Sequence, residues 1–249
     1  VTAGDQYTHI HIQHGRLIDP ANGTDEQLDL YISHGRIAAL GQKPRGFEAD
    51  RIIDASNNIV CPGLVDLAVH LREPGDEHKA SICSETAAAA KGGITTLICT
   101  PDTNPAIDTP AVWALVRRRA KRCGNAHVLA IGALTRDLQG ERLAEMAALQ
   151  QAGCVAVSNG DHPLANTLVA LRAMEYAASF DLPVVLRSED HALKANGCVH
   201  EGPVSARLGL AGIPAVAETV AIARDLALAE HSGARIHFHC PSTAGAAKL

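Results

Sequence analysis

The N-terminal part of the chain alternates apolar and polar side chains in short runs that end at glycine-containing turns. Residues 9–12, 28–32 and 36–40 keep a period of two. That period is typical of strands with one buried face, and glycine favours the tight turns of hairpins. Residues 1–61 are therefore predicted to form a small antiparallel β module.

The pattern changes after the Pro62-Gly63 pair, where short runs rich in valine, isoleucine and leucine begin to alternate with longer amphipathic stretches. The predicted strands are residues 64–69, 94–99, 128–131, 154–157, 183–186 and 235–239. The predicted helices are residues 84–91, 109–122, 141–152, 166–180 and 215–231. Apolar strands that alternate with helices indicate a parallel sheet with helices packed on it.

Six parallel strands favour a (β/α) barrel over a short open sheet, and a complete barrel of this kind has eight. The sequence stops just after the sixth predicted strand. We therefore expect an α/β chain with two parts. The first is a small β-sandwich module at residues 1–61. The second, at residues 62–249, is a (β/α)8 amidohydrolase-type barrel truncated after about six strands, with the last strands and the rest of the β module missing.

The composition is that of an ordinary globular protein, with 47% hydrophobic and 20% charged residues. A net charge of −5 and an aromatic content of 3% do not favour binding to nucleic acid or to an anionic membrane. The basic run at residues 117–122 is interpreted as a solvated helix face. Neither a basic leader nor an apolar run of about 18 residues is found, so no membrane partner is expected.

The seven cysteines are odd in number, widely scattered and without a CxxC pair. This is not the pattern of a disulfide framework or of a zinc ribbon. A chain of this size also has no need of covalent cross-links. We therefore expect no disulfides, no structural zinc and a cytoplasmic location, where thiols stay reduced.

Polar residues follow five of the six predicted barrel strands at their carboxyl ends, where the functional groups of (β/α) barrels lie. They are His70 and Arg72 after the first strand, Asp102 and Asn104 after the second, Asn159 and Asp161 after the fourth, Arg187, Glu189 and Asp190 after the fifth, and His239, Cys240 and Ser242 after the sixth. Any chemistry of the chain is expected from this set.

Residues 62–75, PGLVDLAVHLREPG, resemble the signature of dihydroorotases, the cyclic amidohydrolases of pyrimidine synthesis. Four later blocks continue the similarity, at residues 101–105, 131–135, 201–209 and 242–245. The N-terminal β module also resembles the small composite β domain of that family. In an active member, the resemblance implies one or two zinc ions that convert water into the attacking hydroxide.

The resemblance implies metal ligands at positions that this chain fills with other residues. The His-x-His pair at the end of the first strand is Ala68 followed by His70, so a methyl group replaces one ligand. The acidic pair after the fourth strand is Asn159-Gly160, and Asp161 comes one position late.

The remaining ligand positions are altered as well. The fifth-strand histidine falls at Arg187, whose permanent charge repels a cation. The sixth-strand histidine falls at Cys240, and the neighbouring His239 points to the opposite face. Of the substrate-binding positions, Arg72 is retained, whereas the charge of Asp102 opposes the substrate carboxylate. We assign Arg72, Asp102 and Asn104 as vestigial substrate-binding residues.

A catalytic zinc site needs about three protein ligands and one open position for water. Because only His70 is intact, we expect no metal, no cofactor and no catalytic residue. Residues 67–69, 134–141 and 178–182 carry a narrower resemblance. They resemble the non-catalytic dihydroorotase-like subunits that assemble with aspartate carbamoyltransferase in some bacteria. The predicted partners are the aspartate carbamoyltransferase catalytic chain and further copies of this chain.

Two alternatives stay open. In the first, the chain is an active zinc-dependent dihydroorotase that hydrolyses dihydroorotate to carbamoyl aspartate, with rearranged ligands at His70, Asp161, His239 and Cys240. In the second, it is a binding module that holds a pyrimidine-like ligand through Arg72.

Individual residues carry further expectations. Cys240 is predicted to be buried and inert, and His237 to be packed. His70 is predicted to bond to backbone or water. Arg187 is predicted to form a buried salt bridge with Asp161, Glu189 or Asp190, in which one positive charge replaces another.

Overall fold

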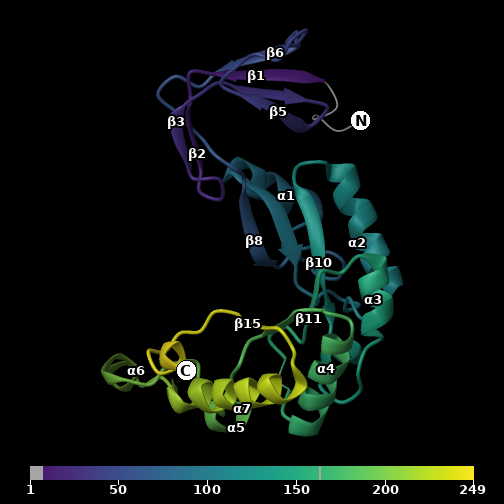
Figure 1. Cartoon of the computed structure of the whole chain (residues 1–249). Coiled ribbons are helices and arrows are strands. Elements are labelled where there is room, and N and C mark those ends of the chain that lie inside the picture. Colours follow the sequence, from purple (N-terminus) through teal and green to yellow (C-terminus); the bar gives the residue numbers. More distant parts are fainter. Residues whose placement is uncertain (1–7, 163) are drawn as a thin grey trace.

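The computed structural model describes residues 8–162 and 164–249, which form a crescent with the β module at one end and helices at the other (Figure 1). The module contains a four-stranded and a three-stranded sheet. In spatial order these are β5 (Arg36–Leu40), β4 (Leu30–Ser33), β1 (His9–Gln13) and β6 (Arg51–Asp54), and then β3 (Thr24–Gln27), β2 (Arg16–Asp19) and β7 (Ile59–Val60).

The strand directions in the module correct the expectation of an antiparallel fold. The β1–β6 and β2–β7 pairs are parallel, whereas the hairpin neighbours are antiparallel. Parallel pairing needs a long return connection, and between β1 and β6 the chain forms the four strands β2 to β5. Strand β3 has only polar side chains and was therefore not predicted. The division at residues 61 and 62 falls between β7 and the next strand, and two separate domains stay a prediction.

The second part is built on a six-stranded sheet in which every pair of neighbours is parallel, as expected for a partial (β/α) barrel. Its spatial order is β15 (Ile236–Phe238), β12 (Val184–Leu186), β11 (Ala156–Ser158), β10 (His127–Ala133), β9 (Ile94–Cys99) and β8 (Leu64–Val69). Strands β8 and β15 are the two edges. A separate pair of short strands is formed by β13 (Val199–His200) and β14 (Gly212–Ile213).

Helices connect these strands. They are α1 (Ile82–Lys91), α2 (Pro110–Cys123), α3 (Met146–Ala152), α4 (Thr167–Ser179), α5 (His191–Lys194), α6 (Pro203–Leu208) and α7 (Val216–Ser232), with short 3₁₀ turns at η2 (Arg136–Leu138) and η3 (Ala246–Lys248). Local sequence sets their ends: Ser81 caps α1, and Gly124 ends α2 with a φ of 67°, a left-handed conformation that glycine adopts without strain. Within the residues that the structure describes, no helix has the length and apolar character needed to cross a membrane.

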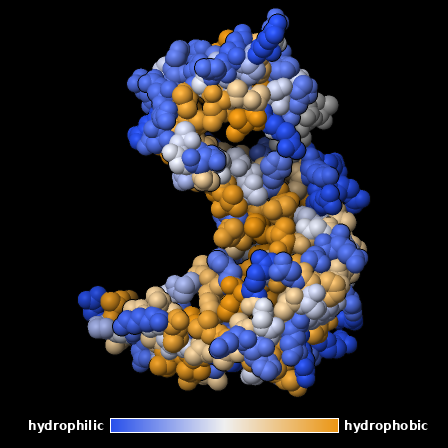
Figure 2. Space-filling model, in the orientation of Figure 1, coloured by the Kyte–Doolittle hydropathy of each residue, from blue (hydrophilic) through white to orange (hydrophobic). Residues whose placement is uncertain are grey.

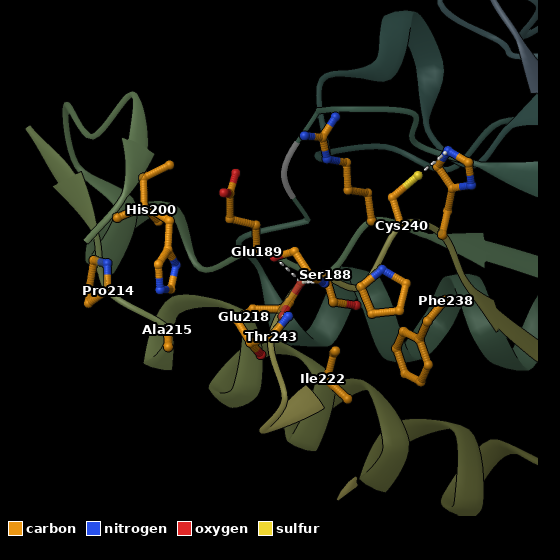
Figure 3. A pocket seen from close by; sticks show the side chains of 15 residues that line it. Ser188, Glu189, His200, Pro214, Ala215, Glu218, Ile222, Phe238, Cys240 and Thr243 are labelled. Atoms are coloured by element: carbon orange, nitrogen blue, oxygen red, sulfur yellow. Dashed lines mark hydrogen bonds between the residues drawn. The ribbon is translucent and has the colours of Figure 1, made fainter. Parts of the chain in front are cut away.

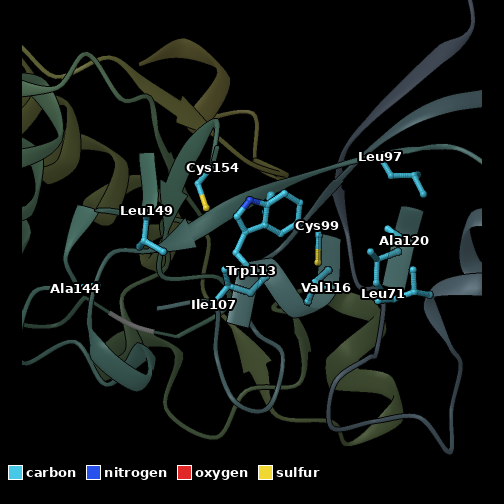
Figure 4. Close-up of a cluster of buried hydrophobic side chains, with 12 residues drawn as sticks. Leu71, Leu97, Cys99, Ile107, Trp113, Val116, Ala120, Ala144, Leu149 and Cys154 are labelled. Atoms are coloured by element: carbon cyan, nitrogen blue, oxygen red, sulfur yellow. The ribbon is translucent and has the colours of Figure 1, made fainter. Parts of the chain in front are cut away.

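The core consists of two main clusters of buried side chains. One packs α1, α2 and α3 against β9 and β10 around Trp113, whose indole N–H donates to the Ala152 carbonyl over 3.0 Å (Figure 4). The other packs α4 and α7 against β11 and β12 around Met174. Apolar surface also lines part of the concave side (Figure 2). Leu64, Val65 and Leu67 of edge strand β8 are exposed.

The helix predicted for residues 141–152 begins five residues later, at Met146. The preceding residues stay outside the helix because they pair with the loop after β10. Leu143 bridges to Thr135, and the Ala144 amide donates to the Leu134 carbonyl over 2.9 Å. A tertiary contact thus overrides a sequence that is compatible with a helix.

A disulfide between Cys83 and Cys123 corrects the expectation of fully reduced thiols. Cys83 lies in the first turn of α1 and Cys123 ends α2, and the packing of these helices brings their Cα atoms to 5.1 Å. That separation is typical of disulfides. Neither the odd number of cysteines nor the missing CxxC pattern reports such proximity, because the two residues are 40 positions apart.

Candidate functional site

The carboxyl ends of β8 and β9 form a small cavity of about 100 Å³. Arg72, Asp102 and Asn104 all line it, together with His70. The structure therefore brings together the three residues that the sequence assigned as vestigial substrate contacts. Their role as such stays a prediction.

His70 bonds to two side chains, whereas we expected a backbone or water partner. Its Nδ1 lies 2.7 Å from Oδ2 of Asp102 and 3.2 Å from Oγ1 of Thr100. The negative charge of Asp102, which opposes a substrate carboxylate, is thus held beside the imidazole. Ala68, two residues earlier on β8, offers only a methyl group.

Asn159 follows β11 and is only 3% exposed. Its Oδ1 accepts a hydrogen bond from the Thr135 hydroxyl over 2.6 Å, and its Nδ2 donates to the carbonyls of Leu138 (3.1 Å) and His162 (3.3 Å). A carboxylate at this position has no N–H to donate, so two carbonyl oxygens would lose their partner. The amide therefore fits this place as a structural group that joins two loops.

Gly160, the second of the expected acidic positions, has a φ of 58°. This left-handed conformation favours glycine over residues with a Cβ atom. A side chain built there would begin 3.7 Å from the Cβ of Asp102, so Gly160 faces the residues after β9. Both members of the expected acidic pair are thus adapted to roles in which they offer no carboxylate.

Arg187 follows β12 and forms the predicted ion pair with Asp161, in which Nη1 and Oδ1 are 2.7 Å apart. The hydrogen bond that Arg187 donates to Asp161 raises the pKa of the guanidinium above its ordinary value. The prediction of a buried pair is wrong, because the two side chains are 49% and 56% exposed. Asp161, the carboxylate that follows the expected acidic pair, is therefore paired with a fixed positive charge.

Cys240 follows β15 and is exposed, which corrects the prediction of a buried thiol. Its Sγ lies 3.1 Å from Nε2 of His239, and both residues line one cavity, so the expectation that His239 points to the opposite face is wrong. His237 is exposed as well and not packed as expected. The exposure of Cys240 and His237 has one cause: β15 is an edge of the sheet, and within residues 8–162 and 164–249 only β12 pairs with it there.

A second cavity, of about 160 Å³, lies at the carboxyl ends of β12 and β15 (Figure 3). Two carboxylates in its lining already have partners. Glu189 pairs with Lys194 at 2.5 Å, and Glu218 accepts hydrogen bonds from the backbone amides of Ser242 and Thr243, each at 2.7 Å. Partial burial acts to raise the pKa of Glu218, but these hydrogen bonds outweigh it and the pKa is lowered. Glu218 thus acts as an anchor for the loop after β15.

Sequence reasoning missed Glu218 and also Asp225, a carboxylate that is 2% exposed within α7. Asp225 accepts hydrogen bonds from the Ser188 hydroxyl (2.6 Å) and from Nε of Arg224 (2.8 Å), and it thereby fixes the segment after β12. A signal was present: positions 217, 221, 225 and 229 form one buried stripe with a spacing of four, and an acidic residue on an alanine stripe indicates a partner.

The donor set does not fit the zinc centre that the family resemblance implies. Across residues 8–162 and 164–249, no group of three or more histidine, cysteine, aspartate or glutamate side chains is placed to hold a metal ion. The two cavities share no lining residue, and His70 lines one while Cys240 lines the other. The rearranged ligand set of His70, Asp161, His239 and Cys240 is therefore not assembled here.

Comparison with known proteins identifies the family of the chain. A family model described as Dihydro-orotase-like matches residues 57–244. The chain is 52% identical over 229 residues to a dihydroorotase-like protein of Pseudomonas aeruginosa and 46% identical over 238 residues to a dihydroorotase of Syntrophotalea carbinolica. These matches cover 92% and 96% of this chain but only 54% and 56% of the relatives, so the chain spans about half of their length.

Solved structures agree on the fold. An L-hydantoinase (dihydropyrimidinase) from Arthrobacter aurescens is similar with a TM-score of 0.73 and 24% identity, over 92% of this chain and 52% of that one. A D-hydantoinase (dihydropyrimidinase) from a Thermus species gives a TM-score of 0.71 at 18% identity, over 96% and 54%. The predicted α/β barrel architecture is confirmed. The chain belongs to the dihydroorotase-like family and carries part of its amidohydrolase-type barrel.

Proposed function

We propose that the protein is a non-catalytic member of the dihydroorotase family in pyrimidine biosynthesis. In this proposal it acts in the cytoplasm as an assembly subunit for the catalytic chain of aspartate carbamoyltransferase. The Arg187–Asp161 ion pair carries the proposal. It places a permanent cation at a ligand position and occupies the nearest carboxylate, and both effects oppose binding of a second cation.

The neighbouring positions support the same reading independently. Asn159 uses both ends of its amide within the protein, and His70 is engaged by Asp102. Meanwhile the barrel strands and their helices are kept. Retention of the scaffold together with the loss of several ligands is what we expect when surface and stability, rather than chemistry, are the useful properties.

The assembly role rests on the similarity of residues 67–69, 134–141 and 178–182 to non-catalytic dihydroorotase-like subunits. It is also in keeping with the name of the relative in Pseudomonas aeruginosa, a dihydroorotase-like protein. A complex that contains aspartate carbamoyltransferase gives such a chain a use that does not depend on zinc.

An active zinc dihydroorotase is the competing function. The contact of 3.1 Å between Cys240 and His239 favours it, because a thiol and an imidazole side by side are zinc ligands. The relative in Syntrophotalea carbinolica is named a dihydroorotase. Against this, the third and fourth ligands would have to come from Asp161 and His70, which are held by Arg187 and Asp102.

The test uses the full-length protein, purified from its own host with and without aspartate carbamoyltransferase. We expect the two proteins to co-elute as a complex whose mass, measured by multi-angle light scattering, exceeds the sum of one copy of each chain. We also expect less than about one tenth of a zinc ion per chain and no cyclisation of carbamoyl aspartate. An active zinc dihydroorotase serves as the positive control of the assay. Near-stoichiometric zinc with turnover overturns the non-catalytic reading, and separate elution overturns the assembly role.

A further inference from the structure

Helix α2 carries five basic residues in its second half and no acidic residue along its whole length. Arg117, Arg118, Lys121 and Arg122 are all exposed. Their spacing of i, i+1, i+4 and i+5 places them on one side of the helix. We call these four residues the basic α2 face.

The four side chains have no counter-charge within the described residues. None of them forms an ion pair or a side-chain hydrogen bond across residues 8–162 and 164–249. The fifth basic residue, Arg119, points elsewhere and contacts Glu73 at 2.8 Å and Glu77 at 3.6 Å. Glu73 and Glu77 therefore neutralise Arg119, and the four residues of the basic α2 face are left available.

Intrahelical electrostatics do not explain the arrangement. Residues four apart on a helix are neighbours, so Arg117 repels Lys121 and Arg118 repels Arg122. The helix dipole favours cations in the last turn, which accounts for Lys121 and Arg122. It does not account for Arg117 and Arg118, which lie one turn earlier.

The basic α2 face borders a hollow of about 630 Å³ with an apolar floor. Pro110, Trp113, Ala114 and Ala152 form that floor. Positions 110, 114, 117 and 121 follow the spacing of four, three and four that gives one stripe on a helix, so the apolar and basic parts of the surface are continuous. A binding partner can thus bury methylene groups and pair its charges at the same place.

We propose that the basic α2 face and its apolar floor bind an acidic amphipathic segment of a partner protein. The helix rises about 1.5 Å per residue, so Arg117 to Arg122 extend over roughly 7.5 Å, which suits a few carboxylates on one peptide segment. A long nucleic acid is disfavoured because the chain has a net charge of −5. The Trp113 ring is also only 2% exposed, which leaves it unavailable for base stacking. The inference goes beyond the proposed function and holds whether or not the chain is catalytic.

The experiment is a fluorescence anisotropy titration of the full chain with short fluorescein-labelled probes. One probe is a peptide of glutamate, leucine and alanine, the second has glutamine in place of every glutamate, and the third is a single-stranded oligothymidine. We expect the acidic peptide to bind, with an affinity that falls as salt is raised, and the glutamine peptide to bind at least ~tenfold more weakly. Equal or tighter binding of the oligothymidine overturns the assignment in favour of a general polyanion site.

Variants locate the binding surface. Arg117→Glu with Arg118→Glu is expected to weaken binding of the acidic peptide at least ~tenfold. The matched control, Arg36→Glu with Arg45→Glu in the β module, changes the net charge equally and is expected to leave binding within about twofold. Circular dichroism checks that both variants fold, and Arg117→Gln with Lys121→Gln repeats the test without charge reversal. No binding by the unmodified chain, or equal loss in the control, overturns the inference.

Discussion

Asn159 occupies a position where an active relative needs a carboxylate, and its amide is bonded at both ends. Replacement by aspartate keeps the size but turns a donor into an acceptor facing the Leu138 and His162 carbonyls. We expect Asn159→Asp to lower the free energy of unfolding by about 1–3 kcal/mol in urea denaturation at neutral pH. The control Asn57→Asp, at an exposed turn, is expected to change it by less than about 0.5 kcal/mol. Equal effects of the two substitutions would show that the hydrogen bonds of Asn159 do not stabilise the fold.

The free thiols give a prediction about exposure. Burial raises the pKa of both Cys99 and Cys154 to about 12, so these thiols stay protonated and shielded at pH 8 and still at pH 10. Cys61, Cys198 and Cys240 are exposed. A thiol reagent such as Ellman's should therefore modify three cysteines of the native protein at either pH and five after unfolding without reductant. Modification of all five in the native state would contradict the packing around Cys99 and Cys154.

The residue scale also shows where sequence reasoning reaches its limit. It identified Asp161 among the partners of Arg187, because the strand pattern places both residues at one end of the sheet. It misjudged the exposure of Arg187, Cys240 and His237, since exposure depends on which strands flank β12 and β15. It did not pair His70 with Asp102, although it placed both at the carboxyl ends of consecutive strands, because that placement does not say which side chains meet.

At the scale of elements, the Cys83–Cys123 disulfide joins α1 to α2 across 40 residues. Closing a loop of this length in the unfolded chain is worth about 4 kcal/mol by chain entropy, and measured values are usually about 2–4 kcal/mol. We expect Cys83→Ser with Cys123→Ser to lower the free energy of unfolding by that amount under oxidising conditions. Dithiothreitol should produce the same loss in the unmodified protein and none in the variant.

The control for the cross-link is Cys61→Ser with Cys198→Ser, which removes two exposed thiols that form no disulfide. This variant should keep the stability of the unmodified protein and its sensitivity to dithiothreitol. A stability that dithiothreitol leaves unchanged would mean that the α1–α2 contact holds without the covalent bond.

Helices and strands were easier to predict than their tertiary pairing. All six barrel strands and five of the helices were predicted, because apolar runs and helical periodicity are properties of consecutive residues. The exceptions depend on distant contacts. Residues 141–145 stay outside α3 because Leu143 pairs with Thr135, and the polar strand β3 exists because β2 supplies its hydrogen bonds.

At the scale of the whole molecule, the accessible surface is large for the mass. A compact monomer of 26.1 kDa exposes about 10,600 Å², whereas this chain exposes 14,400 Å². The excess reflects a six-stranded sheet with two open edges and a concave side. A closed barrel has no such edges, so the incomplete sheet leaves apolar side chains in contact with water.

This openness predicts that the isolated chain of residues 1–249 binds the dye 8-anilinonaphthalene-1-sulfonate while still folded. Val65 and Leu67 are 56% and 50% exposed and lie two residues apart, on one side of edge strand β8, which borders the concave side (Figure 1). Replacing both with serine should reduce the dye fluorescence by about half or more, because contiguous apolar area holds the dye. Leu168→Ser removes a leucine that is 60% exposed at the start of α4, away from β8, and should leave the fluorescence nearly unchanged. Equal loss of fluorescence in the two variants would mean that the dye binds scattered apolar residues. The concave side would then be covered in solution by another contact, such as a second copy of the chain, which sedimentation would detect.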